Sequence, residues 1–138
     1  TWLAACRDLV HESGGSINKY LGDGFFATWP ATDAVAAEFP KLRSELIARQ
    51  QGGGAVFRFV VHAGPTTVDA SMVNGEETLI GATVNFVFRM EKVASREKLP
   101  RLWSREAVDL FAGRMAFSRA LESEVAGFPG RHEFYLDH

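Results

Sequence analysis

The segment TLIGATVNFVFR, residues 78–89 of this 138-residue chain, predicts an amphipathic helix that opens at Gly81. We expect the helix to continue to about Ser95, because apolar residues recur at helical spacing over this range. Val84, Val87 and Phe88 are predicted to form its apolar stripe.

Two polar residues of this segment, Asn85 and Arg89, are four positions apart, so a helix presents them on one face. Arg carries a planar, permanently charged fork that matches phosphate geometry. Asn and Arg are also ordinary solvated residues of an amphipathic helix. The following residues, Met90 to Lys92, do not decide between the two interpretations.

A second informative segment is GGSINKYLGDG, residues 14–24, which leads into Phe25–Trp29 and predicts a β-hairpin. Lys19 and Asp23 are an even number of positions apart, which in a strand places both on one face. The glycines beside Asp23 let a phosphate and a metal approach the backbone closely, and hard Mg²⁺ or Mn²⁺ prefers carboxylate ligands. Taken alone, Gly-Asp-Gly is more typical of a plain hairpin turn.

The rest of the chain alternates between helical and extended patterns. A helix over the first ten residues is followed by a second one, capped by Thr32 or Asp33 and running to about Arg49, which Pro40 should kink or split. Residues 56–62 predict a central strand buried on both sides.

Towards the C-terminus, Ser104 is expected to cap a short helix after a strand over 101–103. Two further strands are predicted over 117–125 and 132–136. The fold class is therefore α/β or α+β, with one sheet covered by helices on one side.

Composition excludes several classes of protein. The length allows one domain, and 46% hydrophobic residues exclude disorder. A net charge of −2 gives no basic excess for nucleic acid. The single cysteine, Cys6, cannot form an internal disulfide, and no apolar run approaches a membrane span. These features, with no signal peptide, lead us to expect a cytoplasmic domain.

Together the two segments resemble the catalytic domains of class III nucleotide cyclases, the adenylyl and guanylyl cyclases. Residues 14–24 match the family's strand-turn-strand with its K-x-x-G-D pattern, and residues 81–89 match its G-x-x-V-N-x-x-x-R helix start. Residues 57–65 look like its I-H-x-G-P strand. The resemblance covers about residues 1–136 and implies a ferredoxin-like βαββαβ core, so that residues 1–138 would be a single cyclase domain.

The resemblance also implies a role for each matching residue. Asp23 would be one of two aspartates that hold a pair of Mg²⁺ or Mn²⁺ ions. Lys19 would donate to an adenine ring nitrogen, and Thr78, where many members have Asp, would accept from the adenine amino group. Asn85 would orient the ribose, and Arg89 would contact the α-phosphate in the transition state.

These assignments imply an adenylyl cyclase that converts ATP into 3′,5′-cyclic AMP and pyrophosphate for intracellular signalling. Guanylyl cyclases typically have Glu and Cys where this chain has Lys19 and Thr78. The resemblance implies a head-to-tail homodimer with composite sites, in which Asp23 of one subunit faces the other four residues of its neighbour. Thr78 also points to the subset of cyclases stimulated by bicarbonate.

The chain departs from the family pattern in two places. The family's first strand, with its F-x-D motif and second metal aspartate, has no counterpart, and Asp8 on a helix is no substitute, so we expect an N-terminally truncated domain. The family's triphosphate-binding lysine near the last hairpin is also absent, and Arg131 is the candidate replacement.

These departures keep a second hypothesis open. The chain would then be a catalytically inactive cyclase-homology domain that serves as a dimerisation or nucleotide-sensing module. A palm-type polymerase or diguanylate cyclase is disfavoured, because Gly14–Asn18 lacks the acidic G-G-[DE]-E-F turn. His62 is expected to be a core histidine rather than a catalytic base.

Overall fold

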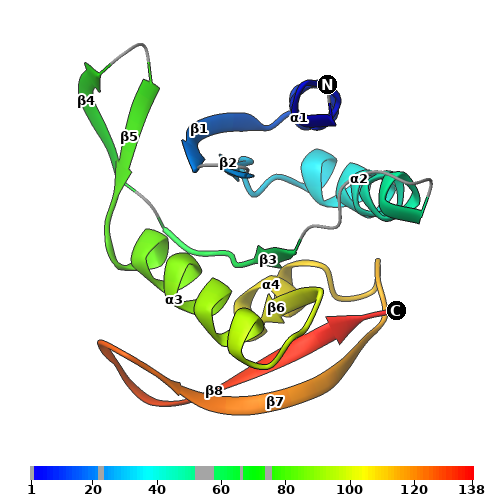
Figure 1. Cartoon of the computed structure of the whole chain (residues 1–138), viewed down its shortest axis with the longest axis vertical. Coiled ribbons are helices and arrows are strands. Elements are labelled where there is room, and N and C mark those ends of the chain that lie inside the picture. The colour runs from blue at the N-terminus through cyan, green and yellow to red at the C-terminus, as the bar shows by residue number, and fades with distance from the viewer. Residues whose placement is uncertain (1, 22–23, 52–57, 66, 74–75) are drawn as a thin grey trace. The chain divides into compact units, whose positions relative to one another are not determined.

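The computed structural model describes residues 2–21, 24–51, 58–65, 67–73 and 76–138 (Figure 1). Helices and strands alternate along the chain, as the sequence predicted. In chain order the elements are α1 (Trp2–Glu12), β1 (Ser16–Leu21), β2 (Gly24–Thr28), α2 (Asp33–Gln51), β3 (Phe59–Val61), β4 (Thr67–Val73), β5 (Glu76–Ile80), α3 (Ala82–Arg96), β6 (Arg101–Ser104), α4 (Arg105–Leu110), β7 (Phe117–Val125) and β8 (Phe128–Asp137).

These elements divide into two compact units. The first comprises residues 1–56 with 69–78, and the second comprises residues 57–68 with 79–138. The described strands pair in three groups, β1-β2, β4-β5 and β3-β6-β8-β7, whereas the sequence pattern predicted a single sheet. The mixed α+β class is confirmed.

In the first unit, β1 and β2 form the predicted antiparallel hairpin, with its turn residues outside the described ranges. The register shifts between Ile17 and Lys19, so Asn18 is the extra residue of a bulge. Asn18 is buried, and its side-chain oxygen accepts a hydrogen bond from the Thr28 hydroxyl at 2.7 Å. This bond satisfies a polar group that the bulge has turned into the interior.

Helix α2 is one continuous helix, so the prediction that Pro40 would split it is wrong. Thr32 is the capping residue, because its hydroxyl accepts from the Val35 backbone N–H at 3.2 Å. Ala36, Phe39 and Leu42 are buried on both sides of the proline. Their burial offsets the roughly 3 kcal/mol that an interior proline costs a helix.

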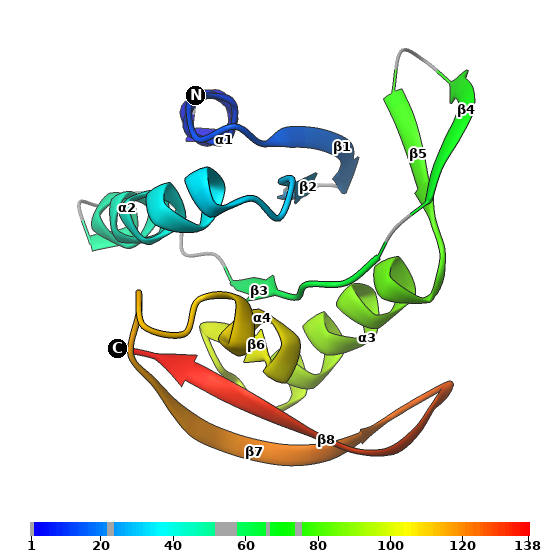
Figure 2. The same ribbon diagram turned by 180° about the vertical axis from the view of Figure 1, so that it is seen from behind.

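The second unit contains the four-stranded sheet, and α3 lies along the inner side of its curved β7–β8 hairpin (Figures 1 and 2). Strand β3 is parallel to β6, and β8 is antiparallel to both β6 and β7. The core between helix and sheet includes the buried side chains of Phe86, Met90, Val93, Ala94, Leu102, Val125 and Phe134.

The prediction for residues 56–62 is only partly correct. Within the described residues, Phe59–Val61 alone form strand β3, which is first in the order of its sheet and half-buried. Residues 62–65 are outside any strand. Alternating apolar residues predicted burial on both faces, but the length of a strand depends on how many backbone groups find a partner strand.

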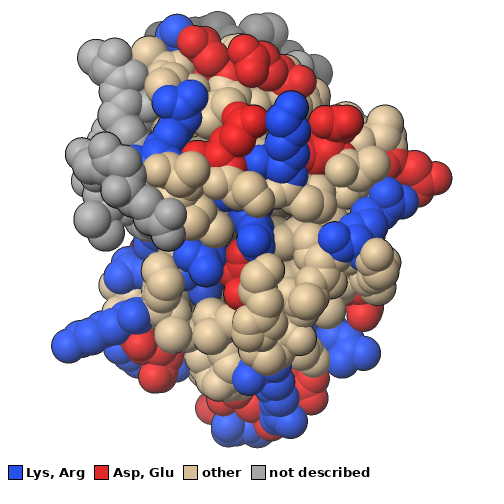
Figure 3. Space-filling model, turned by 90° about the vertical axis from the view of Figure 1, so that its right-hand side faces the viewer, with Lys and Arg blue, Asp and Glu red and all other residues tan. Residues whose placement is uncertain are grey.

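The described part of the chain contains no helix that is both long and apolar enough to cross a bilayer. Figure 3 shows one face of the molecule, where basic and acidic side chains are interspersed over most of the surface and several acidic ones lie together along the upper edge. This distribution agrees with the absence of a basic excess in the composition.

Candidate active site

Helix α3 begins where the sequence predicted. Gly81 is its N-cap, with φ of 124°, a backbone conformation that only glycine adopts without strain. The helix runs from Ala82 to Arg96. Its backbone therefore places Asn85 and Arg89 one turn apart on a regular helix, as expected from their spacing.

Two buried side chains fix which way this helix faces. Phe86 is 5% exposed and Met90 is fully buried, and both pack in the core of the second unit. Asn85 directly precedes Phe86, and Arg89 directly precedes Met90. Because successive helical residues are about 100° apart, burial of the Phe86–Met90 pair turns the Asn85–Arg89 pair away from the core.

Asn85 and Arg89 are accordingly exposed. The predicted apolar stripe is corrected at one position, because Phe88 is also exposed, at 36%, while Phe86 takes its place in the core. Phe88 is three residues from Asn85, on the exposed side of the helix. Val84 is buried and Val87 is half-buried, as predicted.

Arg89 differs in its electrostatic surroundings from other arginines of the second unit. Arg58, Arg96, Arg105, Arg119 and Arg131 each form an ion pair with a carboxylate. Arg101 pairs with the buried carboxylate of Asp137. Among the described residues, Arg89 has no carboxylate partner.

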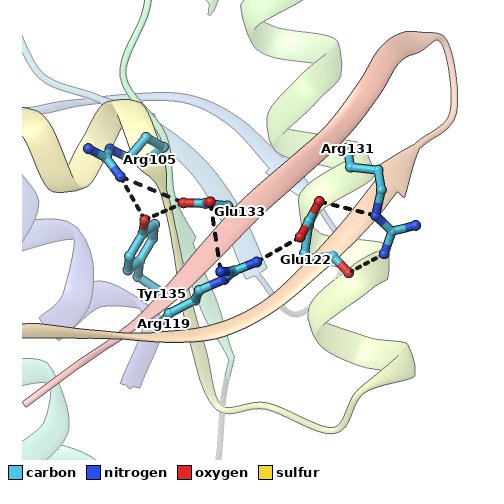
Figure 4. A network of polar contacts seen from close by, with 6 residues as sticks. All are labelled: Arg105, Arg119, Glu122, Arg131, Glu133 and Tyr135. Carbon is cyan, nitrogen blue, oxygen red and sulfur yellow. Dashed lines mark hydrogen bonds and ion pairs between the residues drawn. The ribbon is translucent and has the colours of Figure 1, made fainter.

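Arg131, the candidate replacement for the triphosphate-binding lysine, is engaged within its own hairpin (Figure 4). Its Nε donates to Glu122 Oε1 at 3.2 Å, and its Nη2 donates to the Glu122 backbone carbonyl at the same distance. Glu122 also accepts from Arg119 Nη2 at 2.6 Å. A phosphate at Arg131 would have to compete with these contacts.

The same network continues along β8 through two half-buried residues, Glu133 and Tyr135 (Figure 4). The Tyr135 hydroxyl accepts from Arg105 Nη1 at 2.9 Å and donates to Glu133 Oε2 at 2.6 Å. The hydrogen bond from Tyr135, together with the charge of Arg119, lowers the pKa of Glu133. Every arginine in this network therefore faces an acidic group.

His62 is a core histidine, as predicted, with 8% of its side chain exposed. Its Nδ1 lies 2.7 Å from Ser104 Oγ and 3.7 Å from Glu106 Oε2. Burial lowers the pKa of His62, and the charge of His132 acts in the same direction, while the charge of Glu106 opposes both. No local sequence pattern indicates the contact with Ser104, because the two residues are 42 positions apart.

The remaining predicted site residues belong to the first unit. Lys19 is in β1, where its backbone pairs with Phe26, and Thr78 is in β5. Asp23 lies outside the described residues. The described ranges contain no cluster of three or more His, Cys, Asp or Glu side chains that would hold a metal ion. The convergence of these three residues with Asn85 and Arg89 therefore remains a prediction.

No protein-family model matches the chain. A curated relative is the photoactivated adenylate cyclase subunit beta-like protein FB of Euglena gracilis, 28% identical over 129 residues. The match covers 83% of this chain but only 15% of that protein.

Solved structures give a consistent fold. A bacterial light-regulated adenylyl cyclase matches with a TM-score of 0.69 and 17% identity, over 99% of this chain and 43% of that one. The guanylate cyclase domain of RhGC from Catenaria anguillulae, in complex with GTP, matches with a TM-score of 0.71 and 16% identity, over 99% and 79%. The adenylyl cyclase CyaB from P. aeruginosa matches with a TM-score of 0.68 and 20% identity, over 99% of this chain and 78% of that one.

The chain therefore has the fold of class III adenylyl and guanylyl cyclase catalytic domains, and the resemblance seen in its two motifs is confirmed. It spans less than half of the light-regulated cyclase chain and a small part of the curated relative. Because both adenylyl and guanylyl cyclases share this fold, the fold does not choose between ATP and GTP.

Proposed function

We propose that this chain is the catalytic domain of an adenylyl cyclase, which converts ATP into 3′,5′-cyclic AMP and pyrophosphate. The observation that carries the proposal is the pair Asn85 and Arg89, both exposed on α3, with Arg89 unpaired among the described residues. In a chain with the cyclase fold, this pair stands in the segment that matches the family's substrate-binding helix.

In the proposed reaction, the ribose 3′-hydroxyl attacks the α-phosphorus, its proton leaves, and the bond to the pyrophosphate oxygen breaks. Asn85 holds the ribose so that the hydroxyl is in line with the leaving group. The guanidinium of Arg89 donates two hydrogen bonds to oxygens of the α-phosphate, where negative charge increases in the transition state. Two Mg²⁺ or Mn²⁺ ions, with Asp23 as one ligand, would lower the pKa of the hydroxyl and neutralise the leaving phosphates.

The site is proposed to form between two copies of the chain. Asp23 of one subunit faces Lys19, Thr78, Asn85 and Arg89 of the other, so a C2 homodimer contains two equivalent sites. Neither subunit is then active alone, because the metal ligand and the phosphate ligand come from different copies.

The choice of ATP over GTP is assigned to Lys19 and Thr78. The Lys19 ammonium donates to an adenine ring nitrogen, and the neutral Thr78 hydroxyl accepts from the adenine amino group. Guanine presents a ring N–H and a keto oxygen on this edge, so the Lys19 ammonium would face a donor and the Thr78 hydroxyl would have to donate instead of accept. We also assign bicarbonate stimulation to the site with Thr78, which is tested by assay at fixed pH with bicarbonate or an equal concentration of chloride.

The full-length protein, incubated with ATP or GTP and with Mg²⁺ or Mn²⁺, tests the proposal. We expect cyclic AMP and pyrophosphate in equal amounts and little cyclic GMP. Loss of product in Arg89→Ala would support the assigned role of Arg89. Lys92→Ala is the matched control for that variant, because Lys92 is also an exposed cation on α3. Nucleotide binding without any cyclic product would instead support the inactive nucleotide-sensing module. Predominant cyclic GMP would overturn the roles of Lys19 and Thr78.

A further inference from the structure

Phe86, the residue that turns Asn85 outward, is surrounded by aromatic side chains. Its ring centroid lies 4.5 Å from that of His62, 5.1 Å from that of Phe128 and 5.3 Å from that of His132. His62 is the closest of these three rings and lies tilted by 36° against Phe86. The position of the His62 ring therefore bears directly on the rotation of α3 at Asn85.

The His62 ring is itself held by a hydrogen bond with Ser104. Ser104 is 1% exposed, and its hydroxyl oxygen already accepts the Ala107 backbone N–H at 3.1 Å as the N-cap of α4. Its single hydrogen is then available to donate to His62 Nδ1, at 2.7 Å. This assignment requires neutral His62 with its proton on Nε2, in agreement with the lowered pKa of the ring.

Two residues further along the chain, Gly64 contacts the first turn of the same helix. A Cβ atom at Gly64 would lie 2.9 Å from Thr83 Oγ1 and 3.0 Å from Thr83 Cγ2. The backbone at Gly64 therefore packs directly against the side chain of Thr83. Only a residue without a side chain allows this approach at the present separation.

We propose that the segment His62–Gly64 positions Asn85 and Arg89 for the reaction, through the contacts of His62 with Phe86 and of Gly64 with Thr83. This inference rests on the proposed function. Thr83 and Phe86 lie on either side of Asn85 in α3, so two contacts from one short segment fix the helix both along its axis and in rotation. His62 and Gly64 are positioning residues, because neither is assigned a contact with substrate.

The first arm of the test uses Gly64→Ala. The added Cβ pushes Thr83 away, and we expect kcat to fall by roughly 10-fold to 10²-fold with KM for ATP within about threefold, as for a small misplacement of catalytic groups. Thr83→Ala in the same chain removes both branch atoms, leaving only the Thr83 Cβ at 3.5 Å from the new methyl group. The double variant should therefore recover most of the lost kcat.

The second arm uses His62→Phe, which keeps a ring against Phe86 but cannot accept from Ser104, and His62→Asn, which keeps an acceptor but removes the ring. We expect kcat to fall by about tenfold or more in both. The control is Phe111→Leu, at a buried residue outside α3 whose ring packs edge-on against Trp103. Phe111→Leu should lower the urea midpoint about as much as the two His62 variants do, while leaving kcat nearly unchanged.

Amide hydrogen exchange provides a readout that needs no turnover. In the His62 variants and in Gly64→Ala, exchange at residues 84–87 should accelerate relative to residues 92–95 of the same helix. If the wild-type protein makes no cyclic nucleotide, the proposed function fails, while exchange still tests the contact with α3. The positioning role would be overturned if exchange at residues 84–87 were unchanged in these variants. It would also be overturned if kcat in the His62 variants were no lower than in Phe111→Leu, or if Thr83→Ala failed to restore kcat in Gly64→Ala.

Discussion

Arg101 Nε lies 2.8 Å from Asp137 Oδ1, and the Asp137 side chain has no exposed surface. The pair joins the first residue of β6 to the last residue of β8, at the point where Asp137 also pairs with Phe117 of β7. A buried carboxylate is stable only when its charge is compensated, so Asp137 depends on this link to Arg101.

We expect Asp137→Asn to destabilise the second unit, because it leaves the Arg101 charge without a counter-ion. The loss should be on the order of 3 kcal/mol, measured by urea unfolding. Asp109→Asn is the control, since Asp109 pairs with Arg105 on the exposed surface of α4 and should leave the urea midpoint almost unchanged. Equal midpoints for both variants would show that burial of the Arg101–Asp137 pair has no energetic consequence.

Gly15→Ala should destabilise the first unit. The new Cβ would lie 2.5 Å from Trp29 Cε2 and Nε1 and 2.9 Å from Val10 Cγ1. Trp29 cannot move freely, because its Nε1 donates to Ser13 Oγ at 2.9 Å and its ring packs edge-on against Phe39. We expect a loss of about 1–3 kcal/mol by urea unfolding, as for overpacking.

The neighbouring substitution Ser16→Ala serves as the control for Gly15→Ala, because Ser16 is exposed in β1. It should shift the urea midpoint little. If Gly15→Ala were as stable as Ser16→Ala, the close packing of Trp29 on Gly15 would be refuted.

The stability of the fold should decrease as pH falls below about 6.5, partly through His62. Burial lowers the pKa of this ring from its ordinary value of 6.5 in the folded protein, so below that value the unfolded chain binds a proton that the folded chain does not. The contribution of His62 is therefore complete above pH 6.5 and is lost as pH falls towards the folded pKa.

His62→Asn should flatten this part of the pH profile of urea midpoints, since it removes the titrating group. His11→Asn, at an exposed position at the end of α1, should keep the wild-type slope between pH 7 and pH 5. The explanation is wrong if His62→Asn retains the full slope.

Arg89→Ala should lower kcat by roughly 10² to 10³ without changing the urea midpoint, because it removes one donor to the transition state from an exposed position. Lys92→Ala should have little effect on kcat. An unchanged kcat in purified full-length Arg89→Ala would contradict the assigned role.

The composite site is tested by mixing inactive subunits. Asp23→Ala lacks a metal ligand and Arg89→Ala lacks the phosphate ligand, so a heterodimer of the two should contain one site with both residues intact. We expect activity to reappear on mixing, at up to about half the wild-type rate per heterodimer. A confirmed heterodimer that stays inactive argues against shared sites.

Local patterns predicted most elements correctly. The N-caps at Thr32 and Ser104 and the helix start at Gly81 depend on neighbouring residues alone, and the structure contains all three. The motif between Gly81 and Arg89 likewise identified the exposed pair on α3. The apolar stripe of α3 was predicted to include Phe88, which is exposed. Spacing alone did not show that Phe86 and Met90 are the pair buried in the core.

Long-range contacts were beyond local patterns. Helix α2 continues through Pro40 because Ala36, Phe39 and Leu42 are buried. The contact of His62 with Ser104 depends on the parallel pairing of β3 with β6, which brings residues 42 positions apart to 2.7 Å. Neither arrangement leaves a local signal in the sequence.

The sequence by itself determined the alternation of helices and strands and the two segments that resemble cyclase motifs, because caps, turns and motif spacing act over a few positions. Only the tertiary structure decided which face of α3 is buried, which arginines are neutralised by carboxylates, and how His62 and Gly64 contact that helix. These outcomes depend on packing and charge pairing between distant segments, where the free energy is set by neighbours in space.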